Sequence, residues 1–282
     1  MLRSTVLRNV VALALALFFV RVYPAQWSSF FEDIVGLLQS ASTQSSAPAA
    51  ALLFFHTIIE ISNEIFDQLL KSARDFTQER HVRDGRIRDA IRNSGDAAMM
   101  NTAVLRLIEG AVDSVRAARE AGSGANVSPQ LEIVHWGLRA FALYIRAFSC
   151  ICYFADWLLT ALAAWVDVNL TVTPSTIQLL FTLLSDENVS VRLAASGALL
   201  RMVQKGLKEG GDKLQLFKVL SLGEVLRTLE ERTRAEKAGR DEPNEDEEQF
   251  REYLGRLLEG YGLELLKFTD DVSESGPRVC TD

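Results

Sequence analysis

The arginines of this chain are concentrated in one stretch, and their spacing suits the binding of anions. Residues 71–92 hold seven lysines or arginines and four acids, with most of the arginines in the second half. A guanidinium group can hold a phosphate or a carboxylate through two parallel hydrogen bonds. The candidate phosphate-binding or partner-binding residues are Arg80, Arg83, Arg86, Arg88 and Arg92.

The same stretch also fits a solvated outer helix with internal ion pairs. Asp84 and Arg88 are four residues apart, which is the spacing at which opposite charges meet along a helix. A phosphate-binding surface would instead add a salt-dependent contribution for each phosphate that it neutralises. Both interpretations stay open, and they differ in the salt dependence that they predict.

No set of residues in the chain has the spacing of a catalytic or metal site. Three cysteines and three histidines are scattered, and a glycine-rich nucleotide loop, a nucleophile elbow and a carboxylate pair are missing. These residues are Cys150, Cys152, Cys280, His56, His81 and His135. We therefore expect no catalytic, metal-binding or cofactor-binding residues, and a protein that is not an enzyme.

The net charge of −7 comes almost entirely from one acidic segment, residues 241–252. It has seven acids and one arginine, so the rest of the chain is nearly neutral and has no overall basic field. The segment suits a solvated loop or a surface for a basic partner. The pattern favours the loop.

Composition and periodicity predict an all-α fold. The chain is 48% hydrophobic over 282 residues, and apolar residues recur at intervals of three and four. We expect linkers at 40–48, 122–129 and 240–248, and a disordered tail at 271–282. The predicted helices are 4–22, 27–39, 50–72, 76–94, 96–121, 129–147, 150–166, 174–185, 189–206, 211–236 and 247–267.

Residues 174–200 have the form of a HEAT repeat. Pro174 suits the first turn of a helix, and Asp186 and Asn188 supply a turn and a cap before the second helix. Arg192 is expected to interact with the acid of the turn. A repeat of this kind cannot bury its apolar face alone, so neighbouring helix pairs must stack on it. The prediction is an α-solenoid of stacked antiparallel helix pairs.

The most informative motif joins the first two predicted helices. Pro24 ends the first helix at Tyr23, and Ser28 or Ser29 can cap the next helix, whose apolar stripe is expected to face the first. The motif Tyr-Pro-x-x-Trp-x-x-Phe-Phe, from Tyr23 to Phe31, closely resembles the exportin-T family of importin-β-type karyopherins.

Further segments resemble the same family in order and spacing: 54–70, 85–92, 164–170 and 250–266. The resemblance covers most of residues 5–270 and corresponds to part of the N-terminal third of a much longer chain, so we expect a fragment. Two regions depart from the family, 146–163 and 272–282. The first is either an inserted segment, such as a translated intron, or an alternative helix.

The resemblance implies one HEAT-repeat solenoid segment over residues 1–270. It further implies a nuclear export receptor that binds tRNA cooperatively with Ran-GTP, contacts nuclear pore proteins, and shuttles between nucleus and cytoplasm. Its RNA is read mainly through shape and backbone. An alternative is a HEAT-repeat scaffold that binds proteins and has no RNA role.

A second alternative rests on the N-terminus alone. Arg3 and Arg8 precede an apolar run at 10–20, which imitates a secretory signal, so a secreted helical protein with a signal peptide at 1–25 is conceivable. The run is shorter than the roughly 20 residues that a membrane span needs. We favour a buried solenoid helix and expect no stable membrane insertion.

Overall fold

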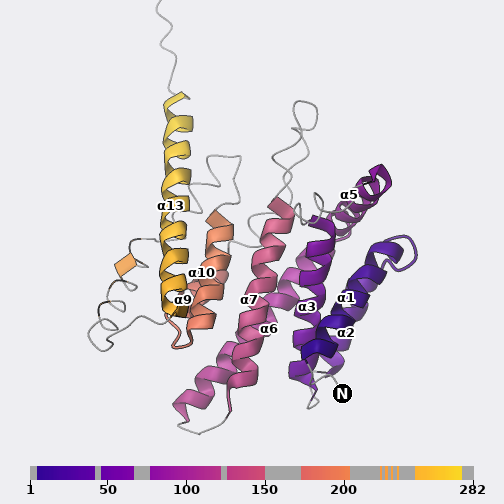
Figure 1. Cartoon of the computed structure of the whole chain (residues 1–282), viewed down its shortest axis with the longest axis horizontal. Helices are drawn as coiled ribbons and strands as arrows, with labels where there is room; N and C mark the ends of the chain where they lie inside the picture. The colour runs from indigo at the N-terminus through magenta and orange to yellow at the C-terminus, as the bar shows by residue number, and fades with distance from the viewer. Residues whose placement is uncertain are drawn as a thin grey trace, which may run out of the picture. The chain divides into compact units, whose positions relative to one another are not determined.

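A computed structural model gives the fold of the chain (Figure 1). The structure describes residues 5–41, 46–66, 77–121, 126–149, 173–203 and 245–274, together with five single positions between 223 and 234. Every regular element in this part of the chain is a helix. The chain divides into two compact units, Met1–Thr171 and Val172–Asp282, which are described separately.

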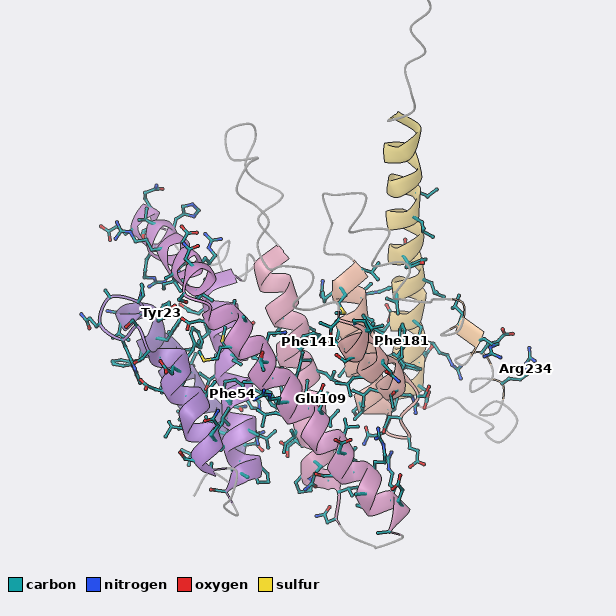
Figure 2. All side chains as sticks on the ribbon, turned by 180° about the vertical axis from the view of Figure 1, so that it is seen from behind. Tyr23, Phe54, Glu109, Phe141, Phe181 and Arg234 are labelled. Carbon is teal, nitrogen blue, oxygen red and sulfur yellow. The ribbon has the colours of Figure 1, made fainter. Side chains whose placement is uncertain are left out.

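The first unit is built around one central helix, α3. Its helices are α1 (Thr5–Val22), α2 (Phe30–Ala41), α3 (Ala47–Phe66), α5 (Gln78–Asn93), α6 (Asp96–Glu120) and α7 (Ser128–Ser149). Helices α1, α2 and α7 pack on α3, and α6 packs on α7 (Figure 1). Phe54 of α3 and Phe141 of α7 are buried in this layer of helices (Figure 2).

Helices α3, α6 and α7 approach closely at a glycine. A Cβ atom added at Gly137 of α7 would lie 2.6 Å from Ile108 Cγ1 and 3.0 Å from Phe55 Cζ. Both Ile108 and Phe55 are fully buried. The missing side chain therefore lets the three helices share one dense core.

An aromatic cluster joins α1 to α2. The ring of Phe19 lies 4.6 Å from that of Phe30 and 5.1 Å from that of Phe31, and Tyr23 stacks on Phe19 at 4.7 Å. Beyond this cluster α1 packs chiefly along α3, while α2 packs on α3 and α6. The apolar stripe of α2 faces α1 at this cluster, as expected, whereas the main partner along α1 is α3.

The second unit contains the predicted HEAT hairpin. It consists of α9 (Pro174–Leu184) and α10 (Val189–Val203), and α13 (Glu245–Glu274) packs on α10. Pro174 lies in the first turn of α9, and the Thr173 hydroxyl accepts a hydrogen bond from the N–H of Thr176. The Asn188 side chain accepts from the N–H groups of Ser190 and Val191, as a helix cap does. The local signals of the repeat are confirmed.

The acidic segment is not a plain loop. From Glu245 onward it forms the first turns of α13, where Glu247 is buried and Phe250 packs under Arg192. The expected partner of Arg192 was also different: Arg192 donates to the backbone carbonyls of Asp186 and Glu187, and its carboxylate partner is Glu247. Part of the acidic segment thus neutralises a buried arginine.

Other boundaries differ modestly from those predicted. Helix α2 begins at Phe30, and Ser29 just before it accepts the Asp33 N–H through its carbonyl. Helix α13 runs to Glu274, so residues 271–274 are helical and not part of a disordered tail. The predicted helix 150–166, most of 211–236 and most of the divergent segment 146–163 lie outside the described residues.

Candidate nucleic-acid interface

Helix α5 carries the five candidate arginines. Thr77 caps it by accepting the N–H of Arg80, and its inner side buries Ile87 and Ile91. The helix packs on α6 and on α1. These two isoleucines fix the rotation of α5, and that rotation decides which arginines reach solvent.

Arg80 has a structural role in holding α5 to α3. Its Nη2 lies 2.7 Å from Glu64 Oε1 and 3.3 Å from the Glu64 carbonyl oxygen. Its Nε is 3.9 Å from Asp84 Oδ2, one turn along the helix. Because this guanidinium is mostly buried between acids, it is the candidate least suited to an external phosphate.

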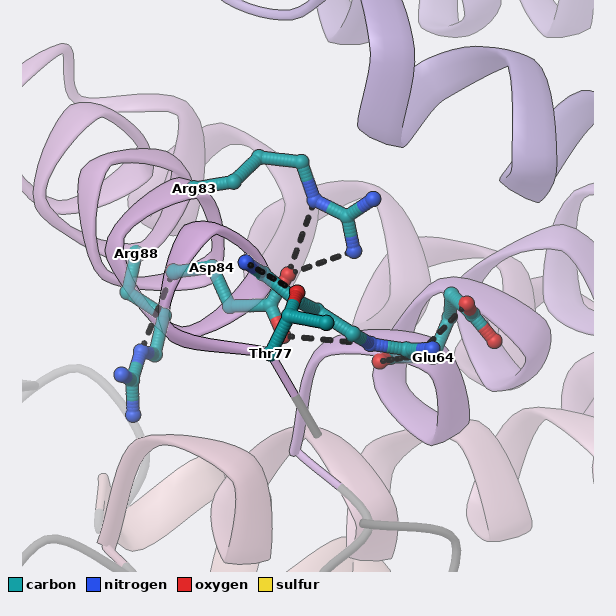
Figure 3. Close-up of polar contacts among 6 residues, drawn as sticks. Glu64, Thr77, Arg83, Asp84 and Arg88 are labelled. Carbon is teal, nitrogen blue, oxygen red and sulfur yellow. Dashed lines mark hydrogen bonds and ion pairs between the residues drawn. The ribbon is translucent and has the colours of Figure 1, made fainter. Parts of the chain in front are cut away.

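Asp84 is the centre of the polar contacts in this region (Figure 3). Its side chain is 0% exposed, and its Oδ1 accepts from Arg83 Nε at 3.1 Å and from Arg83 Nη2 at 2.8 Å. The predicted side-chain pair between Asp84 and Arg88 does not form, because Arg83 and Arg80 take the carboxylate. Arg88 Nε donates instead to the Asp84 backbone carbonyl at 3.2 Å.

The remaining arginines lie on different sides of α5. A helix turns about 100° per residue, so Arg83 and Arg86 lie about 60° apart on one flank, while Arg88 lies on the other. Figure 3 shows Arg83 and Arg88 leaving the helix in different directions. Arg86 is exposed, and Arg83 and Arg88 are half-buried. The side chain of Arg92 lies outside the described part of the chain, so only its place on α5 is known.

Two residues of this region were missed at the sequence level. Glu64 and Asp84 neutralise the inner arginines, and neither was named as a site residue. Asp84 had a detectable signal, because it lies three and seven residues before the buried Ile87 and Ile91 and so shares their stripe. Glu64 comes from another helix, and its pairing with Arg80 requires the tertiary structure.

The side chains of the motif that carries the family resemblance make hydrogen bonds within the first unit. The Tyr23 hydroxyl, at the end of α1 (Figure 2), donates to Asp96 Oδ2 at 2.6 Å in a buried contact. The Trp27 indole N–H donates to Asp33 Oδ2 at 2.6 Å, and the Ser29 hydroxyl donates to the same atom at 2.8 Å. These two hydrogen bonds lower the pKa of Asp33. The motif is therefore a structural junction of the first unit.

A buried histidine lies where α1, α3 and α7 meet. His56 of α3 is 4% exposed, its ring centroid lies 4.1 Å from that of Trp136, and its Nε2 meets no hydrogen-bond partner among the described residues. Burial, and then the charge of Arg8, lower its pKa from 6.5 to about 4. Arg8 itself pairs with Glu132 of α7 at 3.0 Å. His56 is thus held neutral at physiological pH.

We expect this histidine to make the first unit sensitive to acid. The unfolded chain binds a proton near pH 6.5 and the folded chain only near pH 4, so stability is complete above pH 6.5 and falls between pH 6.5 and 4. The loss should reach about 3 kcal/mol at pH 4. Thermal unfolding followed by circular dichroism across this range measures it.

His56→Phe keeps an aromatic ring against Trp136 but cannot take up a proton. Its free energy of unfolding should vary less between pH 6.5 and 4 than that of the wild-type chain. His81→Gln, at an exposed position of α5, is the matched control and should retain the wild-type pH dependence. Equal pH dependence in all three proteins would contradict this role for His56.

Helix α1 is the part of the first unit that resembles a signal or membrane segment. Its 18 residues have a mean hydropathy of 1.9, and one third of them are buried, so by length and composition alone it could cross a membrane. Its inner side is nevertheless part of the core, since Ala12, Ala16 and Phe19 are 0% exposed. Buried Arg8 further ties it to α7. These contacts support a core helix.

Within the described residues there is no group of three or more side chains with metal-binding potential. What the helices present is an arginine-bearing outer helix, a HEAT hairpin and cores shared between helix pairs. This combination is typical of helical-repeat proteins of the α-solenoid class. The all-helical part of the fold prediction is confirmed in every described element.

Comparison with known proteins places the chain within this class. The family described as "Exportin 1-like protein" matches residues 4–199, and the chain belongs to that family. The family has a HEAT-type helical-solenoid fold, as the sequence predicts. The match begins at residue 4, so it includes α1.

Several fungal relatives carry the name Exportin-T. The chain is 46% identical over 270 residues to the protein of Coprinopsis cinerea, an alignment that covers 94% of this chain and 24% of the relative. It is 44% identical over 283 residues to the protein of Laccaria bicolor, which covers 98% of this chain and 24% of that relative. The chain therefore spans about a quarter of the length of these relatives.

Proposed function

We propose that the chain is part of a nuclear export receptor for tRNA. The observation that carries this proposal is the similarity to Exportin-T relatives over nearly the whole chain, within the Exportin 1-like family. The receptor acts by binding and without chemistry. It takes up tRNA together with Ran-GTP in the nucleus, contacts nuclear pore proteins during passage, and releases its cargo in the cytoplasm after GTP hydrolysis.

Cooperative binding requires that tRNA and Ran-GTP favour the same curvature of one solenoid. Residues 1–270 would form part of that solenoid. Since coupling between two ligands is reciprocal, each should tighten the binding of the other by the same factor, typically about 5- to 150-fold. Such coupling distinguishes an export receptor from a HEAT-repeat scaffold that binds proteins only.

The test is fluorescence anisotropy of a labelled tRNA transcript titrated with the chain. Three conditions are compared: no Ran, Ran loaded with GDP, and Ran loaded with a non-hydrolysable GTP analogue. We expect the GTP form alone to tighten tRNA binding. The complete Coprinopsis cinerea relative serves as the positive control, and a Ran-dependent gain in that protein without one in the chain would contradict the proposal for the chain.

A further inference from the structure

We propose that Arg83 and Arg86 form a two-arginine site for the backbone phosphates of RNA, and that buried Asp84 positions Arg83 within it. This inference rests on the proposed function, which it deepens by assigning the contact to one flank of α5. It also removes Arg80 from the set of phosphate ligands.

Among the described residues, Asp84 alone holds the Arg83 guanidinium. Its Nε and Nη2 both donate to Asp84 Oδ1, at 3.1 and 2.8 Å, and these bonds use two of the five N–H donors of a guanidinium. The side chain is 34% exposed, while the carboxylate beneath it is fully buried. Asp84 therefore fixes the plane of the guanidinium, and the nitrogen that does not bond to Asp84 points away from the carboxylate (Figure 3).

Fixing the plane matters because ordering a flexible arginine side chain on binding costs conformational entropy. A guanidinium already fixed by a buried carboxylate avoids part of this cost. Arg86 follows three residues later on the same flank, at the spacing where helical side chains are neighbours. It is exposed, so it can turn to a second phosphate.

Arg80 and Arg88 are arranged differently. The Arg80 guanidinium lies between Glu64 and Asp84, so its charge is already balanced within the unit. Arg88 lies on the opposite flank and donates to a backbone carbonyl. A strand of RNA that lies along the Arg83 flank would not reach it. Two of the five candidate arginines thus form one coherent anion-binding surface.

RNA phosphates are the ligand that follows from the proposed function, since tRNA is the proposed cargo. The chain has no overall basic field to attract an anion from a distance, so phosphate binding must rely on a locally ordered group. Glu79 lies four residues before Arg83 on the same flank and is exposed. Its negative charge repels a phosphate, so removing that charge is expected to increase the affinity for RNA.

The experiment uses the whole chain and a labelled tRNA transcript, with Ran-GTP analogue present, over a series of salt concentrations. Arg83→Glu with Arg86→Glu should weaken binding at least 10-fold and reduce the slope of log K against log salt by about 2. Arg106→Glu with Arg116→Glu on α6 makes the same change of charge at exposed positions and is the matched control. Glu79→Gln should tighten binding.

The role of Asp84 is tested by a double-mutant cycle. Asp84→Asn should weaken tRNA binding about 3- to 10-fold in the wild-type background. In the Arg83→Gln background it should have little effect on tRNA binding. Arg83→Lys keeps the charge but loses the two-bond hold, so it should weaken binding in a protein that remains folded by circular dichroism. If Asp84 has only a structural role, Asp84→Asn should lower the melting temperature in both backgrounds and leave the affinity of the folded protein for tRNA unchanged.

The outcomes separate this inference from the proposed function. Ran-dependent binding by the wild-type chain, with no difference between the α5 and α6 reversals, would overturn the two-arginine site and leave the export function standing. Absence of tRNA binding by the wild-type chain would overturn both. Polyglutamate competing for the site as well as inorganic polyphosphate would overturn its assignment to phosphates, since an acidic protein partner would then fit equally well.

Discussion

Glu247→Ala is expected to lower the free energy of unfolding of the second unit by about 3–5 kcal/mol. Glu247 is the carboxylate partner of Arg192, a residue of α10 that is 2% exposed. Removing the carboxylate leaves a buried guanidinium whose remaining bonds go to two neutral carbonyl groups. The uncompensated charge, and not the lost contact alone, makes the effect large.

The neighbouring residue provides a matched control for this prediction. Glu248 is exposed on the same turn of α13, and Glu248→Ala should change stability by no more than about 0.5 kcal/mol. Arg192→Met combined with Glu247→Leu should recover most of the loss, because an apolar pair in place of a buried ion pair is often neutral or stabilising. Chemical denaturation of the whole chain measures all four proteins. An equal loss in the free energy of unfolding from Glu247→Ala and Glu248→Ala would rule out the buried pair of Arg192 and Glu247 as the cause.

The pairing of Arg192 with Glu247 also shows where sequence reasoning reaches its limit. Pro174, Asp186 and Asn188 were predicted correctly because capping and turn formation depend on neighbouring residues in the chain. The carboxylate partner of Arg192 lies 55 residues away. Local patterns cannot choose among distant acids, so an acidic segment that contributes to the fold looked like a loop.

The candidate interface follows the same division. Composition and periodicity predicted an arginine-rich helix at 76–94, and the structure has it at Gln78–Asn93. The distribution of the arginines over two flanks was not predicted, because it depends on Ile87 and Ile91 packing inward and on Glu64 of another helix taking Arg80. A count of charges along a helix overstates the surface that one ligand can contact.

The packing of α1 shows that an apolar segment does not identify its own partner. Its eleven-residue apolar run suits a signal sequence, a buried helix or half of a hairpin with α2. In the structure α1 uses α3 as its main partner and meets α2 through the aromatic cluster. Truncating that cluster can distinguish a core helix from a removable leader, because only a core helix contributes to the free energy of unfolding of the first unit.

Phe19→Ala is therefore expected to destabilise the first unit by about 3–5 kcal/mol. Phe19 is 0% exposed, and its ring contacts Tyr23, Phe30 and Phe31 at centroid distances between 4.6 and 5.1 Å. Truncation removes the ring that joins α1 to the start of α2 and leaves a cavity between them. Chemical denaturation followed by far-ultraviolet circular dichroism measures the effect.

The adjacent phenylalanine makes this experiment a test of the N-terminal alternatives as well. Phe18 is 51% exposed and meets Trp27 edge-on at 6.1 Å, so Phe18→Ala should cost less than about 1 kcal/mol. The two variants have the same composition and nearly the same hydropathy, which would make them equivalent in a cleaved signal sequence. A large difference between them requires α1 to be folded into the first unit. Two equal and small effects would instead contradict a core role for α1 and favour the secreted alternative.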